Sequence, residues 1–246
     1  MPRFSLGILQ VNHDRSLEIG DRFPDDSHRF RDLLDRLEMR FDYRVYMTIG
    51  GELPESPHAH DGFLITGSPL SVLDDSLFWR DDLFAFIRAC DAEKVPLIGA
   101  CFGHQAVAVA LGGKVAKRTG GYNVGVEPTR FHATKPFMHA DQPDLSFYMF
   151  HEDEVVALPD DIEVIGRSEG CAIASFAKGD HILAVQAHPE FHDSFMRAVL
   201  EFSKSAMSDD CYATALASLA RPTDGAVFAE WMAAFLTAGR AEAGGV

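Results

Sequence analysis

The sequence contains few basic residues for its length. Its 246 residues include 22 lysines and arginines against 37 aspartates and glutamates, so the formal net charge is -15 at pH 7. Binding to nucleic acid or to an anionic membrane needs a basic face, and this charge therefore argues against both classes of partner. The sequence also lacks an apolar run of membrane-spanning length, and its first residues carry no signal-peptide pattern.

The sequence has only four cysteines, and none of them forms a Cys-x-x-Cys pair. They are Cys90, Cys101, Cys171 and Cys211. This spacing provides neither a metal-binding nor a disulfide signature, and it predicts a reducing, cytoplasmic setting. The sequence also lacks a Gly-x-x-x-x-Gly-Lys-Ser/Thr loop and a strand-linked Gly-x-Gly-x-x-Gly motif, which are common phosphate-binding patterns. We therefore expect no metal and no cofactor.

Apolar runs and amphipathic segments alternate along most of the chain. This alternation predicts an α/β fold with a doubly wound, mostly parallel sheet flanked by helices. Ligands of such sheets bind beyond the carboxyl ends of the strands. The polar loop over residues 12–26 follows the first predicted strand, so it is either solvated surface or part of a pocket. Strands are predicted at residues 4–11, 45–47, 62–66, 95–98, 126–131, 147–150, 162–167, 172–176 and 182–185, and helices at 27–41, 79–92, 105–111, 193–207, 208–220 and 226–238.

One stretch combines a short strand, a sharp turn and a helix. The apolar run at 95–98 leads into Gly99-Ala100-Cys101-Phe102-Gly103, and a buried helix follows. A reactive side chain at such a turn is the nucleophile-elbow arrangement, in which the glycines permit a tight backbone. The amino-terminal end of the helix would stabilise a thiolate at Cys101. The alternative is that Cys101 is a small, buried apolar residue.

A second stretch supplies a candidate base. The predicted strand at 182–185 is followed by His188, Pro189 and Glu190. A thiol nucleophile needs a base, and the base needs an orienting carboxylate. Pro189 favours an extended conformation at His188, and side chains two residues apart in an extended segment share one face. We therefore expect Glu190 to hold one ring nitrogen of His188 while the other faces Cys101.

Together these motifs resemble those of the class I (triad) glutamine amidotransferases. Gly-Ala-Cys-Phe-Gly-His-Gln stands at 99–105 and Gln-Ala-His-Pro-Glu at 186–190. The resemblance runs from about Gly62 to about Phe191, and residues 63–69 resemble the strand and oxyanion loop of the family. The segments around His151 and 179–183 resemble a free-standing branch that includes cytosolic γ-glutamyl peptidases.

The resemblance implies a flavodoxin-like class I glutamine amidotransferase fold. We expect a catalytic domain over residues 1–192. The remaining residues, 193–246, exceed what a minimal amidotransferase domain requires. They are predicted to form a helical extension that packs on the same domain.

The resemblance also implies hydrolysis of a γ-glutamyl amide. The Cys101 thiolate would attack the side-chain carbonyl of glutamine and form a γ-glutamyl thioester, with His188 moving the proton and Glu190 orienting the ring. Water would then release glutamate, so that the products are glutamate and ammonia. The backbone N–H groups of Gly67 and Phe102 are the candidate oxyanion-hole donors.

Four further residues are candidate substrate contacts. Gln105 lies one helical turn past the nucleophile and either binds the α-amino or carboxylate end of the substrate or is a buried polar residue. The resemblance places substrate-contacting backbone near Asn123 and Val124, although this segment is alternatively a structural connection. His151 resembles the substrate-side His-x-Asp segment of the family.

The sequence leaves several functions open. No synthetase domain is recognisable, so the chain is either the glutaminase of a two-protein amidotransferase with a separate synthetase partner, or a stand-alone γ-glutamyl peptidase. In both cases the substrate is a small γ-glutamyl compound. A third reading is a non-catalytic binding protein on the same fold, against which the intact Cys101, His188 and Glu190 argue. The His-Pro-Glu spacing disfavours an unrelated cysteine hydrolase.

Overall fold

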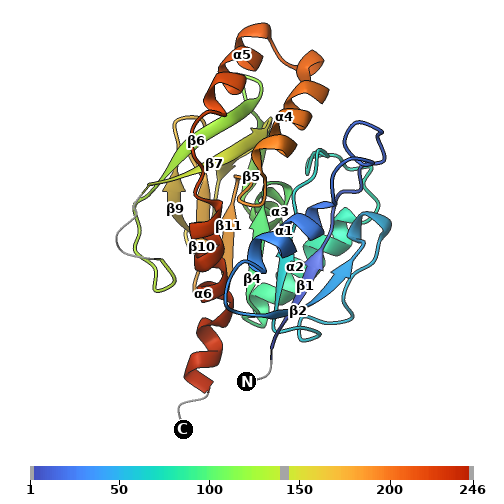
Figure 1. Cartoon of the computed structure of the whole chain (residues 1–246). Coiled ribbons are helices and arrows are strands. Elements are labelled where there is room, and N and C mark those ends of the chain that lie inside the picture. Colours follow the sequence, from blue (N-terminus) through green and yellow to red (C-terminus); the bar gives the residue numbers. More distant parts are fainter. Residues whose placement is uncertain (1–2, 139–143, 244–246) are drawn as a thin grey trace.

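A computed structural model describes residues 3–138 and 144–243 of the chain, with side chains up to residue 238. Within these residues a nine-stranded sheet and a two-stranded sheet are flanked by helices (Figure 1). The strands are β1 (Phe4–Leu9), β2 (Phe41–Tyr46), β3 (Gly62–Ile65), β4 (Leu97–Ala100), β5 (Lys114–Lys117), β6 (Asn123–Phe131), β7 (Asp144–His151), β8 (Asp153–Ala157), β9 (Glu163–Arg167), β10 (Ser175–Lys178) and β11 (Ile182–Val185). The helices are α1 (Asp26–Leu34), α2 (Arg80–Ala92), α3 (Phe102–Ala110), α4 (Asp193–Phe202), α5 (Asp209–Ser218) and α6 (Gly225–Ala243).

The large sheet has a parallel half and an antiparallel half. Its strand order is β2-β1-β3-β4-β11-β10-β9-β6-β7. The first five strands pair in parallel, and β11, β10, β9, β6 and β7 then pair successively antiparallel. The parallel half has the strand order of flavodoxin-like folds. The predicted fold class is therefore confirmed, and the antiparallel strands extend the sheet at one edge.

Helices cover both faces of the parallel half. Residues of α1 and α6 form one hydrophobic cluster with β1, β3, β4 and β11, and residues of α2 and α3 form a second cluster on the opposite face. Figure 1 shows α1 and α6 in front of the sheet and α2 and α3 behind it. This double cover explains why β3, β4 and β11 are buried along their whole lengths.

Helix α6 contributes large side chains to the main core. Phe228, Trp231 and Phe235 are at most 1% exposed. Trp231 packs edge-on against Phe131 of β6, with ring centroids 5.0 Å apart. The carboxyl-terminal residues are thus part of the layer that covers the sheet. The domain boundary predicted at residue 192 stays a prediction, and residues 244–246 of the predicted extension lie outside the described residues.

The second half of the predicted helix over residues 27–41 is wrong. Helix α1 ends at Leu34, and Phe41 begins β2, where it pairs with Phe4. Leu37 and Phe41 pack on the same core as α1. Their spacing therefore imitates a helical pattern, although Phe41 reaches the core from a strand.

The connection after the elbow helix is also more regular than predicted. It contains β5, and β5 pairs with β8, a strand with no counterpart in the prediction. Val155 is the buried apolar residue of β8, Asp153 is its buried polar residue, and Val156 is 50% exposed, so β8 carries little apolar signal. Among the described residues, no helix is long and apolar enough to cross a membrane.

Candidate active site

Cys101 lies at the turn between β4 and α3, as the elbow pattern predicts. Its backbone is held at φ 51° and ψ -104°, a conformation that non-glycine residues rarely adopt and that costs about 1–3 kcal/mol. A Cβ on Gly99 would lie 2.5 Å from the carbonyl oxygen of Gly103, and a Cβ on Gly103 would lie 2.5 Å from that of Ile65. Both glycines are therefore required for the close contact of strand and helix that positions Cys101.

His188 follows β11 and lies at the same edge of the sheet as Cys101. Its N–H donates to the carbonyl oxygen of Tyr148 in β7 at 2.9 Å, which fixes the backbone after the strand. Nδ1 of His188 is 2.8 Å from Oε1 of Glu190. Because an ionised carboxylate only accepts hydrogen bonds, Nδ1 carries the proton in this contact. The side chains of His188 and Glu190 are 6% and 0% exposed, so the contact is shielded from water.

The electrostatics at His188 favour the charged imidazole. Burial alone would lower its pKa, but the adjacent Cys101 sulfur and the Glu190 carboxylate outweigh burial and raise the pKa of His188 to about 10. The ring is therefore protonated at neutral pH. A cation next to Cys101 is the environment in which a cysteine serves as a nucleophile.

Gly67 lies directly against both residues. A Cβ at this position would lie 2.8 Å from Cε1 of His188 and 3.5 Å from Cβ of Cys101. Gly67 follows β3, and the N–H of Gly103 donates to the carbonyl oxygen of neighbouring Thr66 at 3.2 Å. Within the described part of the chain, the N–H groups of Gly67 and Phe102 donate to no protein acceptor. The structure thus brings both predicted oxyanion donors to Cys101, and their role stays a prediction.

The other buried cysteines have a different environment. Burial raises the pKa of Cys90 and of Cys171 to about 12. Both thiols therefore stay protonated at neutral pH. Neither lines the cavity described next. Cys101 is the cysteine that combines a cavity position with a neighbouring imidazole.

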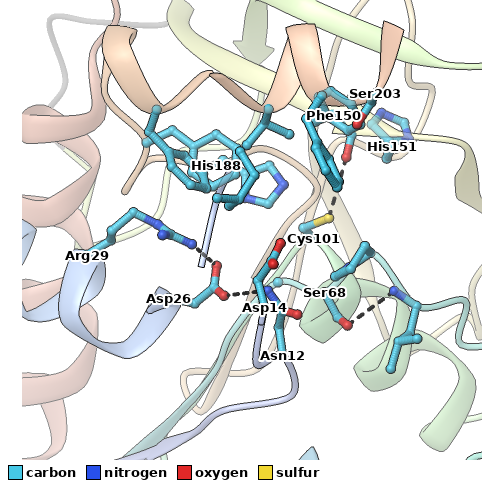
Figure 2. A pocket seen from close by; sticks show the side chains of 18 of the residues that line it. Asn12, Asp14, Asp26, Arg29, Ser68, Cys101, Phe150, His151, His188 and Ser203 are labelled. Atoms are coloured by element: carbon cyan, nitrogen blue, oxygen red, sulfur yellow. Dashed lines mark hydrogen bonds and ion pairs between the residues drawn. The ribbon is translucent and has the colours of Figure 1, made fainter. Parts of the chain in front are cut away.

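Cys101 and His188 open into a cavity of about 330 Å³ (Figure 2). Figure 2 shows Cys101 between His188 on one side and Ser68 and His151 on the other. One part of the lining is polar, and the other part is apolar or aromatic. The polar part includes Ser68, Ser71, Gln105, His151 and Asp153, and the apolar part includes Ile19, Phe23, Phe191, Phe195, Val199 and Phe202.

Gln105 and His151 line the cavity but are engaged in the protein. Nε2 of Gln105 donates to the carbonyl oxygen of Asp153 at 2.8 Å and to Oε1 of Gln186 at 3.1 Å. Nδ1 of His151 donates to the same carbonyl oxygen at 2.9 Å. Burial lowers the pKa of His151 to about 4, so its ring is neutral. Both side chains therefore fix the polar wall, and their predicted substrate contact stays a prediction.

Asn123 and Val124 do not line the cavity. Nδ2 of Asn123 lies 3.2 Å from Nε2 of His151, so Asn123 reaches the site through the histidine. Val124 packs with Phe150 against the cluster formed by β6, β7, α4 and α5. The proposed substrate contacts of these two residues stay predictions. In addition, the described residues contain no group of His, Cys, Asp and Glu that could hold a metal ion.

An aromatic contact behind His188 carries no sequence motif. The Phe191 ring stacks on the His188 ring, with centroids 3.9 Å apart and planes at 19°. Phe195 packs edge-on against Phe191 at 4.6 Å. The guanidinium carbon of Arg29 lies 3.8 Å from the Phe195 ring centroid, and Arg29 pairs with Asp26. The apolar spacing of α4 could have pointed to Phe195, but nothing in the sequence pairs it with residues 26 and 29.

Comparison with known proteins gives the family. The model of the class I glutamine amidotransferase family matches residues 37–204. Gamma-glutamyl peptidase 2 of Arabidopsis thaliana is 31% identical over 162 residues, which are 64% of this chain and 65% of that protein. The glutamine-hydrolyzing GMP synthase of Leifsonia xyli subsp. xyli is 35% identical over 147 residues, 57% of this chain and 28% of that protein. The matched stretch thus spans less than two thirds of either relative.

The fold agrees with this assignment. The crystal structure of a glutamine amidotransferase from Thermotoga maritima superimposes with a TM-score of 0.75, over 96% of this chain and 99% of that one. At 18% sequence identity, this likeness concerns the fold. The family model, in contrast, matches well over half of the sequence and includes the elbow and the His-Pro-Glu segment. The chain belongs to the class I glutamine amidotransferase family.

Proposed function

We propose that this protein hydrolyses γ-glutamyl amide bonds through Cys101, His188 and Glu190. The observation that carries the proposal is the contact of Glu190 with His188 at 2.8 Å, next to a cysteine held in a strained turn at the wall of a cavity. The membership in the class I glutamine amidotransferase family supports it.

The proposed reaction has two steps. The Cys101 thiolate attacks the γ-carbonyl carbon, and the N–H groups of Gly67 and Phe102 stabilise the oxyanion. The carbon–nitrogen bond then breaks as His188 gives its proton to the departing nitrogen, which leaves a γ-glutamyl thioester. A water molecule gives a proton to His188 and attacks the thioester, and the thiolate leaves. The sum is a γ-glutamyl amide and water converted into glutamate and an amine.

Glutamine is the first candidate substrate, with ammonia as the leaving amine. The GMP synthase relative is named as glutamine-hydrolyzing, and a separate synthetase partner would supply the ammonia acceptor. A γ-glutamyl peptide is the second candidate, because the cavity next to Cys101 and His188 is also lined by Phe23, Phe195 and Val199, which ammonia as a leaving group would leave uncovered. The relative named gamma-glutamyl peptidase 2 supports this candidate. The reducing cytoplasm, expected from the cysteine pattern, is the proposed setting.

One competition experiment tests both candidates. The purified chain alone is incubated with equal concentrations of glutamine and a γ-glutamyl dipeptide, and mass spectrometry follows the loss of each. Loss of glutamine supports a glutaminase, and loss of the dipeptide supports a peptidase. Cys101→Ala should abolish the loss of either compound, and Cys90→Ala, at a buried cysteine away from the cavity, should keep it. Full turnover by Cys101→Ala would contradict the mechanism.

A further inference from the structure

A row of aromatic side chains lines one side of the cavity and begins at His188; we call this side the aromatic wall. Phe191 stacks on His188 with ring centroids 3.9 Å apart, Phe195 packs on Phe191 at 4.6 Å, and Phe23 packs on Phe195 at 5.2 Å. All four residues line the cavity. A continuous row of rings therefore leads from the imidazole along one side of the cavity.

Helix α4 continues this wall. Phe195, Val199 and Phe202 are four and three residues apart, so they share one face of the helix, and all three line the cavity. Phe202 is 51% exposed, and Val199 is half-buried. The wall thus has apolar surface that the protein itself leaves uncovered. Such surface at a cavity is typical of a ligand-binding site.

Two charged groups beside the wall are paired within the protein. Arg29 and Asp26 form an ion pair in which both side chains are 5% exposed. Asp26 also accepts a hydrogen bond from Nδ2 of Asn12 at 2.9 Å. The face of the guanidinium lies against the Phe195 ring at 3.8 Å. Arg29 and Asp26 are therefore not available to bind a charged ligand, and Asp14, whose carboxylate also lines the cavity, disfavours an anionic one.

The position of the wall relates it to one part of the substrate. In the proposed function, on which this inference rests, His188 protonates the departing nitrogen, so the leaving amine lies beside His188. His151, in the polar part of the cavity, lies on the other side of Cys101 from His188 (Figure 2). This polar part suits the charged end of a glutamyl group. Phe23 of the wall precedes residue 37, where the family match begins, so this part of the wall is outside the matched family pattern.

We propose that the aromatic wall formed by Phe23, Phe195, Val199 and Phe202 is a subsite for the leaving amine, and that the preferred substrates are γ-glutamyl conjugates of apolar amines. Ammonia would leave this surface empty. A bulky hydrocarbon group on the nitrogen would cover it, and each methylene buried in such a site changes kcat/KM by about tenfold or more.

The test compares two amides whose amines have similar basicity. The probes are γ-glutamyl cyclohexylmethylamide and γ-glutamyl methylamide, and kcat/KM is measured for each with the full chain. We expect the cyclohexylmethylamide to be favoured at least about tenfold. Phe202→Ala and Val199→Ala should each reduce this ratio several-fold. Phe78→Ala should keep it, because Phe78 is 73% exposed and does not line the cavity.

The outcomes separate the inference from the function on which it rests. Equal kcat/KM for both amides would overturn the subsite while leaving γ-glutamyl hydrolysis intact. A large ratio that neither Phe202→Ala nor Val199→Ala reduces would also overturn it, because the preference would then come from elsewhere. If neither amide nor glutamine is hydrolysed, the proposed function itself fails.

Discussion

Gly67 and His188 are in such close contact that no side chain fits between them. A Cβ at residue 67 would lie 2.8 Å from Cε1 of the His188 ring, a distance that real Cβ atoms essentially never show. The two residues follow β3 and β11, the strands on either side of β4. The backbone after β3 therefore sets one limit on where the imidazole can lie.

Gly67→Ala should impair turnover without unfolding the protein. The added methyl group would displace His188 from Cys101, and a displacement of about 1 Å can reduce the rate about 10²-fold. The measurement is kcat/KM with a γ-glutamyl amide, together with Tm. Gly50→Ala is the matched control, because a Cβ there meets nothing within 4 Å. Wild-type kcat/KM in a folded Gly67→Ala variant would contradict the proposed position of His188.

Glu190→Gln should shift the alkaline limb of the pH profile. The pKa of His188 is raised to about 10 despite burial, in part by the Glu190 carboxylate. In the proposed mechanism the charged imidazole protonates the leaving amine, so activity should be lost as pH rises through this pKa. Without the carboxylate the pKa falls, and the limb moves to lower pH.

Glu190→Gln should also lower kcat strongly. Removing the orienting carboxylate of a comparable triad lowers kcat by about 10⁴-fold. The pH dependence of kcat/KM is measured for Glu190→Gln and for Glu169→Gln, an exposed glutamate away from the cavity. An unchanged alkaline limb in Glu190→Gln would show that this carboxylate does not act on His188.

Phe191→Ala should change the titration of His188 as well. The two rings are stacked at 3.9 Å, so the protonated imidazole lies on an aromatic face, a contact worth about 0.5–2 kcal/mol. Loss of the ring should lower the pKa of His188 by up to about 1.5 units, and kcat/KM near pH 9 should fall by up to about fourfold. Phe78→Ala serves as the control. A loss of activity that is equal at every pH would indicate that Phe191 acts by packing alone.

Trp231→Ala should destabilise the whole fold. Trp231 of α6 is 1% exposed and packs against Phe131 of the sheet. Replacing a buried tryptophan by alanine typically costs about 3–5 kcal/mol. Denaturant unfolding measures the change, with Leu17→Ala as the control at a side chain that is 73% exposed. A cost below about 1 kcal/mol would mean that α6 is a removable extension rather than a core layer.

The sequence predicts the parallel half of the fold well because its signals are local. The runs around β3, β4 and β11 are apolar, since helices cover both faces of these strands. The elbow is equally local, because Gly99 and Gly103 flank Cys101 at fixed spacing. The failure at Phe41 has the opposite cause: its contact with Phe4 comes from a separate strand, and the helical spacing cannot reveal it.

The apolar part of the site could not be predicted from the sequence, because its contacts also join residues that are far apart along the chain. Phe23, Phe191 and Phe195 meet only because the loop after β1 folds against α4. In the sequence, each of these residues alone indicates only an ordinary apolar position. His188 and Glu190, in contrast, are two residues apart, so their contact follows from the local chain. The contact between these two side chains was therefore predictable, and the aromatic wall beside them was not.

The most direct test of the account is to trap the covalent intermediate. The chain is mixed with a γ-glutamyl amide, quenched in acid during turnover and digested, and mass spectrometry examines the peptide that contains Cys101. The account predicts one added γ-glutamyl group on Cys101 in the wild type and in Cys90→Ala. Hydrolysis that continues in Cys101→Ala, or an acyl group found on another residue, would contradict it.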